Sequence, residues 1–350
     1  MDKQEIKQSR GEDEILTFLQ VICAYAVVTL HTNGQFWNFS STESYWLTAN
    51  VIECVCYFAV PIFFMITGIT LINYQDRYST KEYFKKRITK TLLPYIAWSC
   101  IGIIVLYVFG SMESVTLKYV VNGLLNGNII NVYWFFPALF CIYLSLPLFA
   151  AIDKAKRKWI FEYLFVSSIL INVLIPFIKT ISGIDIGWPY SVGAVSGNLI
   201  WIVAGVLLYW YPPRKNVKCI MVCLGLIGLL VHIVGTYKLS MAAGSIDRTY
   251  KGYGNLPSIL YSLGAFIVLT EIGKKVMKVE ILQKAIIFLG KYSFAIYLMH
   301  WYVMNTLSKI INVDTKSIVW RLGAPIIIEI IVIGITYVLR QIPLVKRLVP

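Results

Sequence analysis

The sequence predicts an all-α integral membrane protein with about ten transmembrane helices around a central tunnel. Three observations support this prediction: an apolar composition, the length of the apolar runs, and the placement of positive charge. Of the 350 residues, 58% are hydrophobic and only 14% are charged, and the mean hydropathy is +0.69. Soluble domains are about half apolar and a quarter charged. The composition therefore excludes an ordinary soluble globular protein.

The apolar runs are long enough to cross a bilayer. Each extends over roughly 17–25 residues, which as a helix spans a hydrocarbon core of about 30 Å. Lipid offers no hydrogen bonds to the backbone, so these runs must be helical. We predict spans at residues 15–33, 48–73, 91–110, 132–152, 159–177, 195–211, 218–237, 257–272, 287–307 and 322–339.

The positive charge predicts the orientation of these spans. With the N-terminus inside, the predicted cytoplasmic segments hold 23 of the Lys and Arg residues and the outer segments hold 8. Cytoplasmic loops carry the excess of Lys and Arg, so both ends are predicted to be cytoplasmic. We expect a cytoplasmic tail over 1–14, one membrane domain over 15–339 and a second tail over 340–350. No soluble segment is long enough to form a nucleic-acid-binding face, despite the net charge of +14.

Polar side chains inside the predicted spans indicate candidate functional residues, because they are costly in lipid. His31, at the outer end of the first span, follows Gln20 by eleven residues. This spacing puts both on nearly the same helix face, roughly 16 Å apart along the axis. Such a stripe suits an elongated ligand threaded through the membrane. A histidine wetted by lipid headgroups is the alternative interpretation.

Three more polar residues lie in predicted spans. Glu53 begins the second span and is expected near His31, because a short outer loop joins the two spans. A carboxylate there could orient the imidazole and stabilise its protonated form, and an acid at headgroup level is the alternative. His300 in the ninth span is either a site residue or a hydrogen-bond partner between helices. His232 has no polar neighbours in sequence and is expected to be structural.

A basic segment, RYSTKEYFKKRITK, follows the second span directly. We call four of its residues the basic cluster: Lys85, Lys86, Arg87 and Lys90. The cluster could anchor the topology or contact anionic lipid. It could also clamp phosphates, which Lys and Arg bind strongly.

Six motifs, taken in order, resemble those of the membrane acyltransferase-3 family. They are AVVTLH in the first span, FAVPIFFMITGITL in the second, YFKKRITKTLLPYIAW at the third, VYWFFPALFCIYLSLPL in the fourth, IWIVAGVLLY in the sixth and KYSFAIYLMH in the ninth. Together they cover most of the chain, and the ordered set is more specific than any single motif.

The resemblance implies an O-acyltransferase that moves an acyl group, commonly acetyl, from cytoplasmic acyl-CoA to a hydroxyl of an extracytoplasmic polysaccharide or glycolipid. His31 matches the family's catalytic histidine and would act as general base, with an acyl-histidine intermediate as the competing mechanism. The basic cluster would hold the donor's phosphates. Tyr133, Trp134 and His300 are candidate substrate contacts. We expect no metal, a bacterial plasma-membrane location and contacts with membrane lipids, and a homodimer stays open.

Two positions depart from the family pattern. The family usually has Arg or Lys where this chain has Gln20, and many members have arginine where it has Tyr57. A neutral amide can hydrogen-bond to a phosphate but supplies no charge. Gln20 therefore remains a donor-binding candidate with three interpretations. The donor is held differently, the acyl donor is unusual, or the chain is a catalytically altered member that transports a glycan or small solute.

Overall fold

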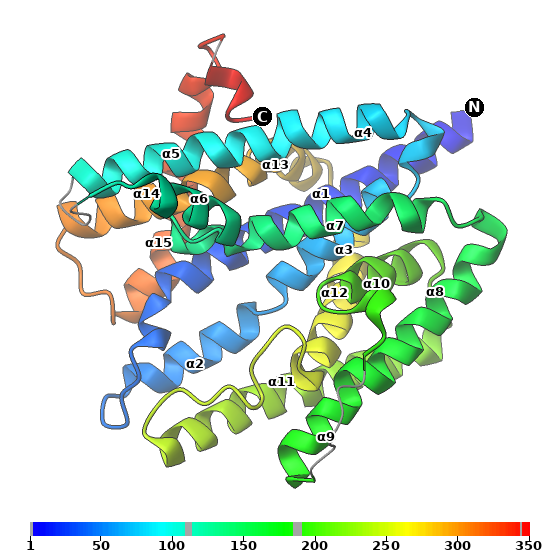
Figure 1. The fold of residues 1–350 in the computed structure, drawn as a ribbon, viewed down its shortest axis with the longest axis horizontal. Helices are drawn as coiled ribbons and strands as arrows, with labels where there is room; N and C mark the ends of the chain where they lie inside the picture. The colour runs from blue at the N-terminus through cyan, green and yellow to red at the C-terminus, as the bar shows by residue number, and fades with distance from the viewer. Residues whose placement is uncertain (1–2, 109–113, 185–190, 344) are drawn as a thin grey trace. The chain divides into compact units, whose positions relative to one another are not determined.

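The computed structural model describes residues 3–108, 114–184, 191–343 and 345–350, and every regular element in these ranges is a helix (Figure 1). The chain divides into two compact units. Unit 1 comprises residues 1–70, 152–293 and 313–326, and unit 2 comprises 71–151, 294–312 and 327–350.

Eight segments of the described chain are helices long and apolar enough to cross a membrane. They are Glu14–Thr32, Tyr45–Asp76, Thr80–Val108, Asn131–Ala150, Lys154–Ser182, Lys215–Ala243, Leu256–Val276 and Ile318–Leu339. A multi-pass helical protein is thereby confirmed.

The predicted count of ten spans is not confirmed. The predicted span 287–307 falls on two helices, α13 (Glu280–Gly290) and α14 (Ser293–Ile310), which are bent by 63° to each other. The predicted span 195–211 is the helix α10 (Leu199–Trp210) of 12 residues. At 1.5 Å per residue α10 is about 18 Å long, too short for a hydrocarbon core of about 30 Å. Its residues 200–206 are all buried. The apolar side chains of α10 are therefore explained by packing inside the protein, without a membrane crossing.

In unit 1, α1 (Lys3–Thr32) packs against α2 (Tyr45–Cys56), α12 (Leu256–Val276) and α13. Glycines allow the closest approaches. A Cβ at Gly273 would lie 2.8 Å from Phe18, and one at Gly290 would lie 2.3 Å from Thr17. Small residues at helix contacts are typical of membrane proteins, where close van der Waals packing drives association.

Two further helix pairs of unit 1 pack in the same way. Gly68 of α3 (Ala59–Leu71) and Gly205 of α10 each face the backbone of the other helix. Gly225 of α11 (Lys215–Ala243) faces Gly264 of α12, and these two helices form an antiparallel hairpin (Figure 1). The unit is completed by α8 (Lys154–Ser168), α9 (Ile175–Ser182) and the start of α15 (Ile318–Leu339).

Unit 2 contains α4 (Thr80–Arg87), α5 (Leu93–Val108), α6 (Leu117–Asn126), α7 (Phe135–Ala150) and most of α14. Tyrosine hydroxyls connect its helices. Tyr83 donates to the carbonyl of Tyr143 at 3.0 Å, and Tyr95 donates to the carbonyl of Leu124 at 2.6 Å. These bonds satisfy polar groups that would be costly inside a membrane.

Candidate active site

His31 lies in the last turn of α1 and is half-buried, while the two residues that follow it are buried. Gln20 is on the same unbroken helix and is also half-buried. The eleven-residue spacing therefore corresponds to about 16 Å of continuous helix. Both side chains are partly accessible, and so are Val21, Ile22 and Tyr25 between them. The stripe therefore stays a prediction.

A buried arginine holds the chain just after His31. Arg321 of α15 is 2% exposed. Its backbone carbonyl accepts a hydrogen bond from the Thr32 hydroxyl at 2.9 Å. Its guanidinium donates to Thr48 Oγ1 at 2.8 Å and to Asn33 Oδ1 at 3.3 Å. Arg321 thus joins the end of α1, the start of α2 and the start of α15, and it fixes the backbone next to the candidate base.

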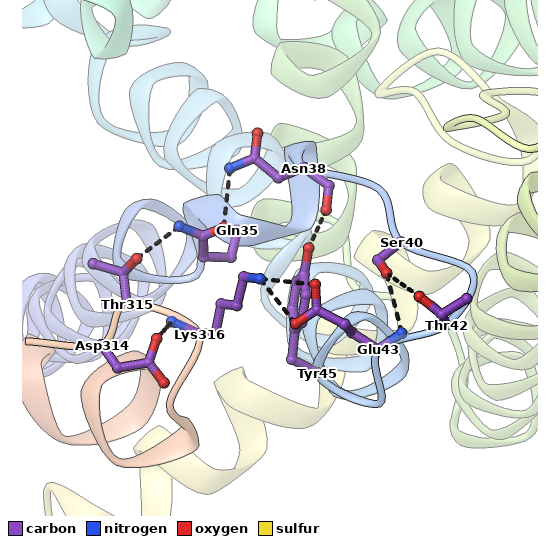
Figure 2. Close-up of polar contacts among 9 residues, drawn as sticks. All are labelled: Gln35, Asn38, Ser40, Thr42, Glu43, Tyr45, Asp314, Thr315 and Lys316. Carbon is purple, nitrogen blue, oxygen red and sulfur yellow. Dashed lines mark hydrogen bonds and ion pairs between the residues drawn. The ribbon is translucent and has the colours of Figure 1, made fainter.

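The loop between α1 and α2 carries a polar cluster with the segment before α15 (Figure 2). Lys316 Nζ lies 2.8 Å from each carboxylate oxygen of Glu43, and Gln35 Nε2 donates to Thr315 Oγ1 at 2.6 Å. The hydrogen bond to Glu43 raises the pKa of Lys316 above its usual range. The ion pair connects the two segments.

Glu53 forms an ion pair with Lys251, a partner that the sequence analysis did not predict. Lys251 Nζ lies 2.7 Å from Glu53 Oε1, and both side chains are buried. The ammonium is surrounded by the rings of Tyr57, Phe36 and Trp37, with centroids at 3.9, 4.9 and 5.4 Å. An ammonium over aromatic faces is attracted by their quadrupoles. At Tyr57, one of the two departures from the family pattern, the structure thus brings in a positive charge from a distant loop.

The basic cluster belongs to unit 2. It occupies the last turn of α4 and the π-helical turn Ile88–Leu92 that follows. Lys85 and Lys90 are exposed. Single π-helical turns are rare and occur frequently at functional sites. These two lysines are therefore the members most accessible to a ligand.

The other two members of the cluster pack on tyrosines. Lys86 Nζ lies 3.7 Å from the ring centroid of Tyr78. The guanidinium of Arg87 lies 5.7 Å from the ring centroid of Tyr83 and 5.4 Å from that of Tyr143. These contacts hold the two side chains in place before any ligand binds. Binding an anion would therefore cost less side-chain entropy.

The candidate substrate contacts also lie in unit 2. Tyr133 is buried and donates its hydroxyl to the carbonyl of Leu298 at 2.7 Å, whereas Trp134 is 38% exposed. His300 is buried, and its Nδ1 lies 2.8 Å from the carbonyl of Tyr297. A carbonyl only accepts, so Nδ1 carries a proton. Of the three candidates, Trp134 alone presents an open surface.

The candidate residues therefore form two groups. Gln20, His31 and Glu53 belong to unit 1, and the basic cluster with Tyr133, Trp134 and His300 belongs to unit 2. Lys251 and Arg321 join the first group. Among the residues that the structure describes, no three His, Cys, Asp or Glu side chains are grouped so that they could hold a metal ion.

Comparison with known proteins gives one match. A family model described as an acyltransferase domain matches residues 13–340 of the chain. No curated protein and no solved structure matches. The matched range contains every candidate residue described above.

Proposed function

The chain belongs to the acyltransferase-3 family, and from that premise we propose that it is an acyl-CoA-dependent membrane O-acyltransferase. The donor is cytoplasmic acyl-CoA, with acetyl-CoA the first candidate. The acceptor is a hydroxyl of an extracytoplasmic polysaccharide or glycolipid. The observation that carries the proposal is the family match over residues 13–340. The protein would span a bacterial plasma membrane many times, with both ends in the cytoplasm.

His31 acts as general base in this proposal. Its ring accepts the proton of the acceptor hydroxyl while the hydroxyl oxygen attacks the thioester carbonyl carbon. The carbon–sulfur bond then breaks, the acyl group remains on the acceptor oxygen, and the proton passes to the coenzyme A thiolate. The last turn of α1 supports this role, because the carbonyl end of a helix stabilises a positive charge by about 0.3–1 kcal/mol.

An acyl-histidine intermediate is the competing route for the same residues. The His31 ring nitrogen would attack the thioester first, and the acceptor hydroxyl would then take the acyl group from the ring. Coenzyme A release before acceptor addition distinguishes the two routes, because only the covalent route gives a burst of thiol without acceptor.

The basic cluster would hold the phosphates of the donor. The exposed ammonium groups of Lys85 and Lys90 support this role, since charge-assisted hydrogen bonds to phosphate are stronger than neutral ones. Gln20 would contact the donor along α1 through its neutral amide. Trp134, with its exposed ring, would contact the acceptor substrate. Tyr133 and His300 are buried and would support the helices around it.

A transporter of a glycan or small solute is the second candidate function, and Gln20 is the observation that favours it. A neutral side chain at this position of α1 supplies no charge to an anionic donor. A transporter would bind its solute without consuming acyl-CoA.

One experiment separates these functions. Purified protein in detergent is mixed with radiolabelled acetyl-CoA and envelope glycan, and released coenzyme A and labelled glycan are measured together. The proposal expects both products from the wild type and neither from His31→Ala. If thioester cleavage and transfer are absent from the wild type, or do not depend on His31, the enzymatic proposal is wrong.

A further inference from the structure

A groove runs along the hairpin of α11 and α12 within unit 1. Its wide section, of about 720 Å³, lies where α11 begins and α12 ends. A narrower section of about 270 Å³ continues from it, and Val222 and Val268 line both. We call the two sections together the hairpin groove.

Lysines gather at the wide section. Lys215, Lys218 and Lys275 line it together with Glu271. The carboxylate oxygen Oε1 of Glu271 lies 3.1 Å from Lys218 Nζ and 3.0 Å from Lys274 Nζ. One carboxylate is thus shared by two lysines, and in the described part of the chain Lys215 and Lys275 form no ion pair. The wide section is net positive.

The narrow section is apolar. A Cβ at Gly225 would lie 3.0 Å from the Cα of Gly264, so the two backbones touch and form the floor of the groove. Leu226, Leu229 and other apolar side chains form its walls. From Lys218 to Leu229 the helix rises about 16 Å, roughly half of a hydrocarbon core of about 30 Å. The length therefore corresponds to one leaflet.

We propose that the hairpin groove binds one anionic phospholipid. The headgroup phosphate lies among Lys215, Lys218 and Lys275, and one acyl chain follows the apolar section past Leu226. The net positive charge next to an apolar channel of leaflet length favours a lipid whose headgroup has a net negative charge over a zwitterionic one. Each lysine near the headgroup raises the affinity for an anionic lipid about fivefold. The site is independent of the proposed reaction, since it contains none of the candidate catalytic residues.

The test is native mass spectrometry of the full chain in detergent, titrated with phosphatidylglycerol or with phosphatidylcholine of the same acyl chains. The wild type should bind one phosphatidylglycerol at least tenfold more tightly than phosphatidylcholine. Lys215→Ala with Lys275→Ala should lose about 25-fold, while the two Lys→Arg changes together should retain binding. Lys156→Ala with Lys158→Ala, on α8, is the matched control and should bind as the wild type does.

A second pair of variants tests the apolar section without changing charge. Leu226→Trp fills the groove, whereas Leu224→Trp adds the same ring at an exposed position of α11 that does not line it. Only Leu226→Trp should weaken binding. The proposal is overturned if the two lipids bind equally, if the alanine pair binds as the wild type does, or if both tryptophan variants behave alike. Preferential retention of palmitoyl-CoA would make the groove a donor site and would equally overturn it.

Discussion

Lys251 Nζ lies 2.7 Å from Glu53 Oε1, and neither side chain exposes more than 5% of its surface. Removing two charges from water is costly, and their attraction offsets this cost only with good geometry. Here the aromatic rings of Tyr57 and Phe36 add to the attraction. The pair ties the loop before α12 to α2, close in sequence to the break between α2 and α3.

Breaking this pair on one side should be strongly destabilising. Lys251→Met leaves the Glu53 carboxylate buried without compensation, and we expect a loss of about 3–5 kcal/mol in the free energy of unfolding. Lys251→Met combined with Glu53→Gln should recover most of that loss. Denaturant unfolding in detergent measures the cycle, and additive effects of the two single changes would contradict a coupled pair.

The same cycle tests whether Glu53 assists His31. If it does, the double variant should be folded but slow in acyl transfer. If its only role is to pair with Lys251, the double variant should transfer at close to the wild-type rate.

Arg321 should be essential for holding the end of α1, next to His31, against the start of α2. Arg321→Met removes donors to Thr48 and Asn33, and hydrogen bonds from charged groups contribute about 1.5–3 kcal/mol each. We expect a loss of stability of about 2–4 kcal/mol together with a lower kcat. Arg214→Met, at an exposed arginine, is the control and should leave both unchanged. Equal behaviour of the two variants would show that the Arg321 contacts do not hold the site.

The basic cluster should act on donor binding. Lys85→Ala with Lys90→Ala should raise the KM for acyl-CoA about tenfold or more and leave kcat nearly unchanged, because phosphate contacts remote from the reacting carbon affect binding uniformly. Steady-state kinetics with acetyl-CoA measures this split. Lys154→Ala with Lys156→Ala serves as the control, and an equal rise in KM there would mean that the cluster has no special role.

Substituting Gln20 tests whether this residue contacts the acyl-CoA donor. Gln20→Arg restores the charge usual in the family and should lower the KM for acyl-CoA if Gln20 is a weakened donor contact. The measurement is the same kinetic assay. An unchanged KM would place Gln20 off the donor path and would favour the transport interpretation.

Much of the fold was predictable from sequence, because bilayer thickness sets the length of helices that cross it. The exceptions have physical causes. The run 195–211 reads as a span because it is apolar, yet α10 has only 12 residues and is buried by other helices. The run 287–307 contains Lys291 and Tyr292 at the 63° break between α13 and α14, and hydropathy does not register such a bend.

The candidate site was predictable only where its residues are local in sequence. His31 and Gln20 share one helix, so their spacing fixed their relationship. Lys251 is 198 residues from Glu53, and Arg321 is 288 residues from Asn33. In the sequence both are simply positive charges of predicted outer loops. Their partners are set by how the helices pack, which the sequence does not show. The only sequence feature that could have marked these two residues is that each is a cation beside the start of an apolar run.

The transfer rate of His31→Gln, compared with that of His232→Gln, tests the central claim most directly. His232 is also in unit 1, is buried, and packs edge-on against Tyr57 at 5.1 Å, so it controls for the loss of a histidine. With labelled acetyl-CoA and glycan, His31→Gln should reduce transfer by about 10²–10⁴-fold, the usual contribution of a general base. His232→Gln should stay within a few fold of the wild type. Transfer by folded His31→Gln at the wild-type rate would contradict the account.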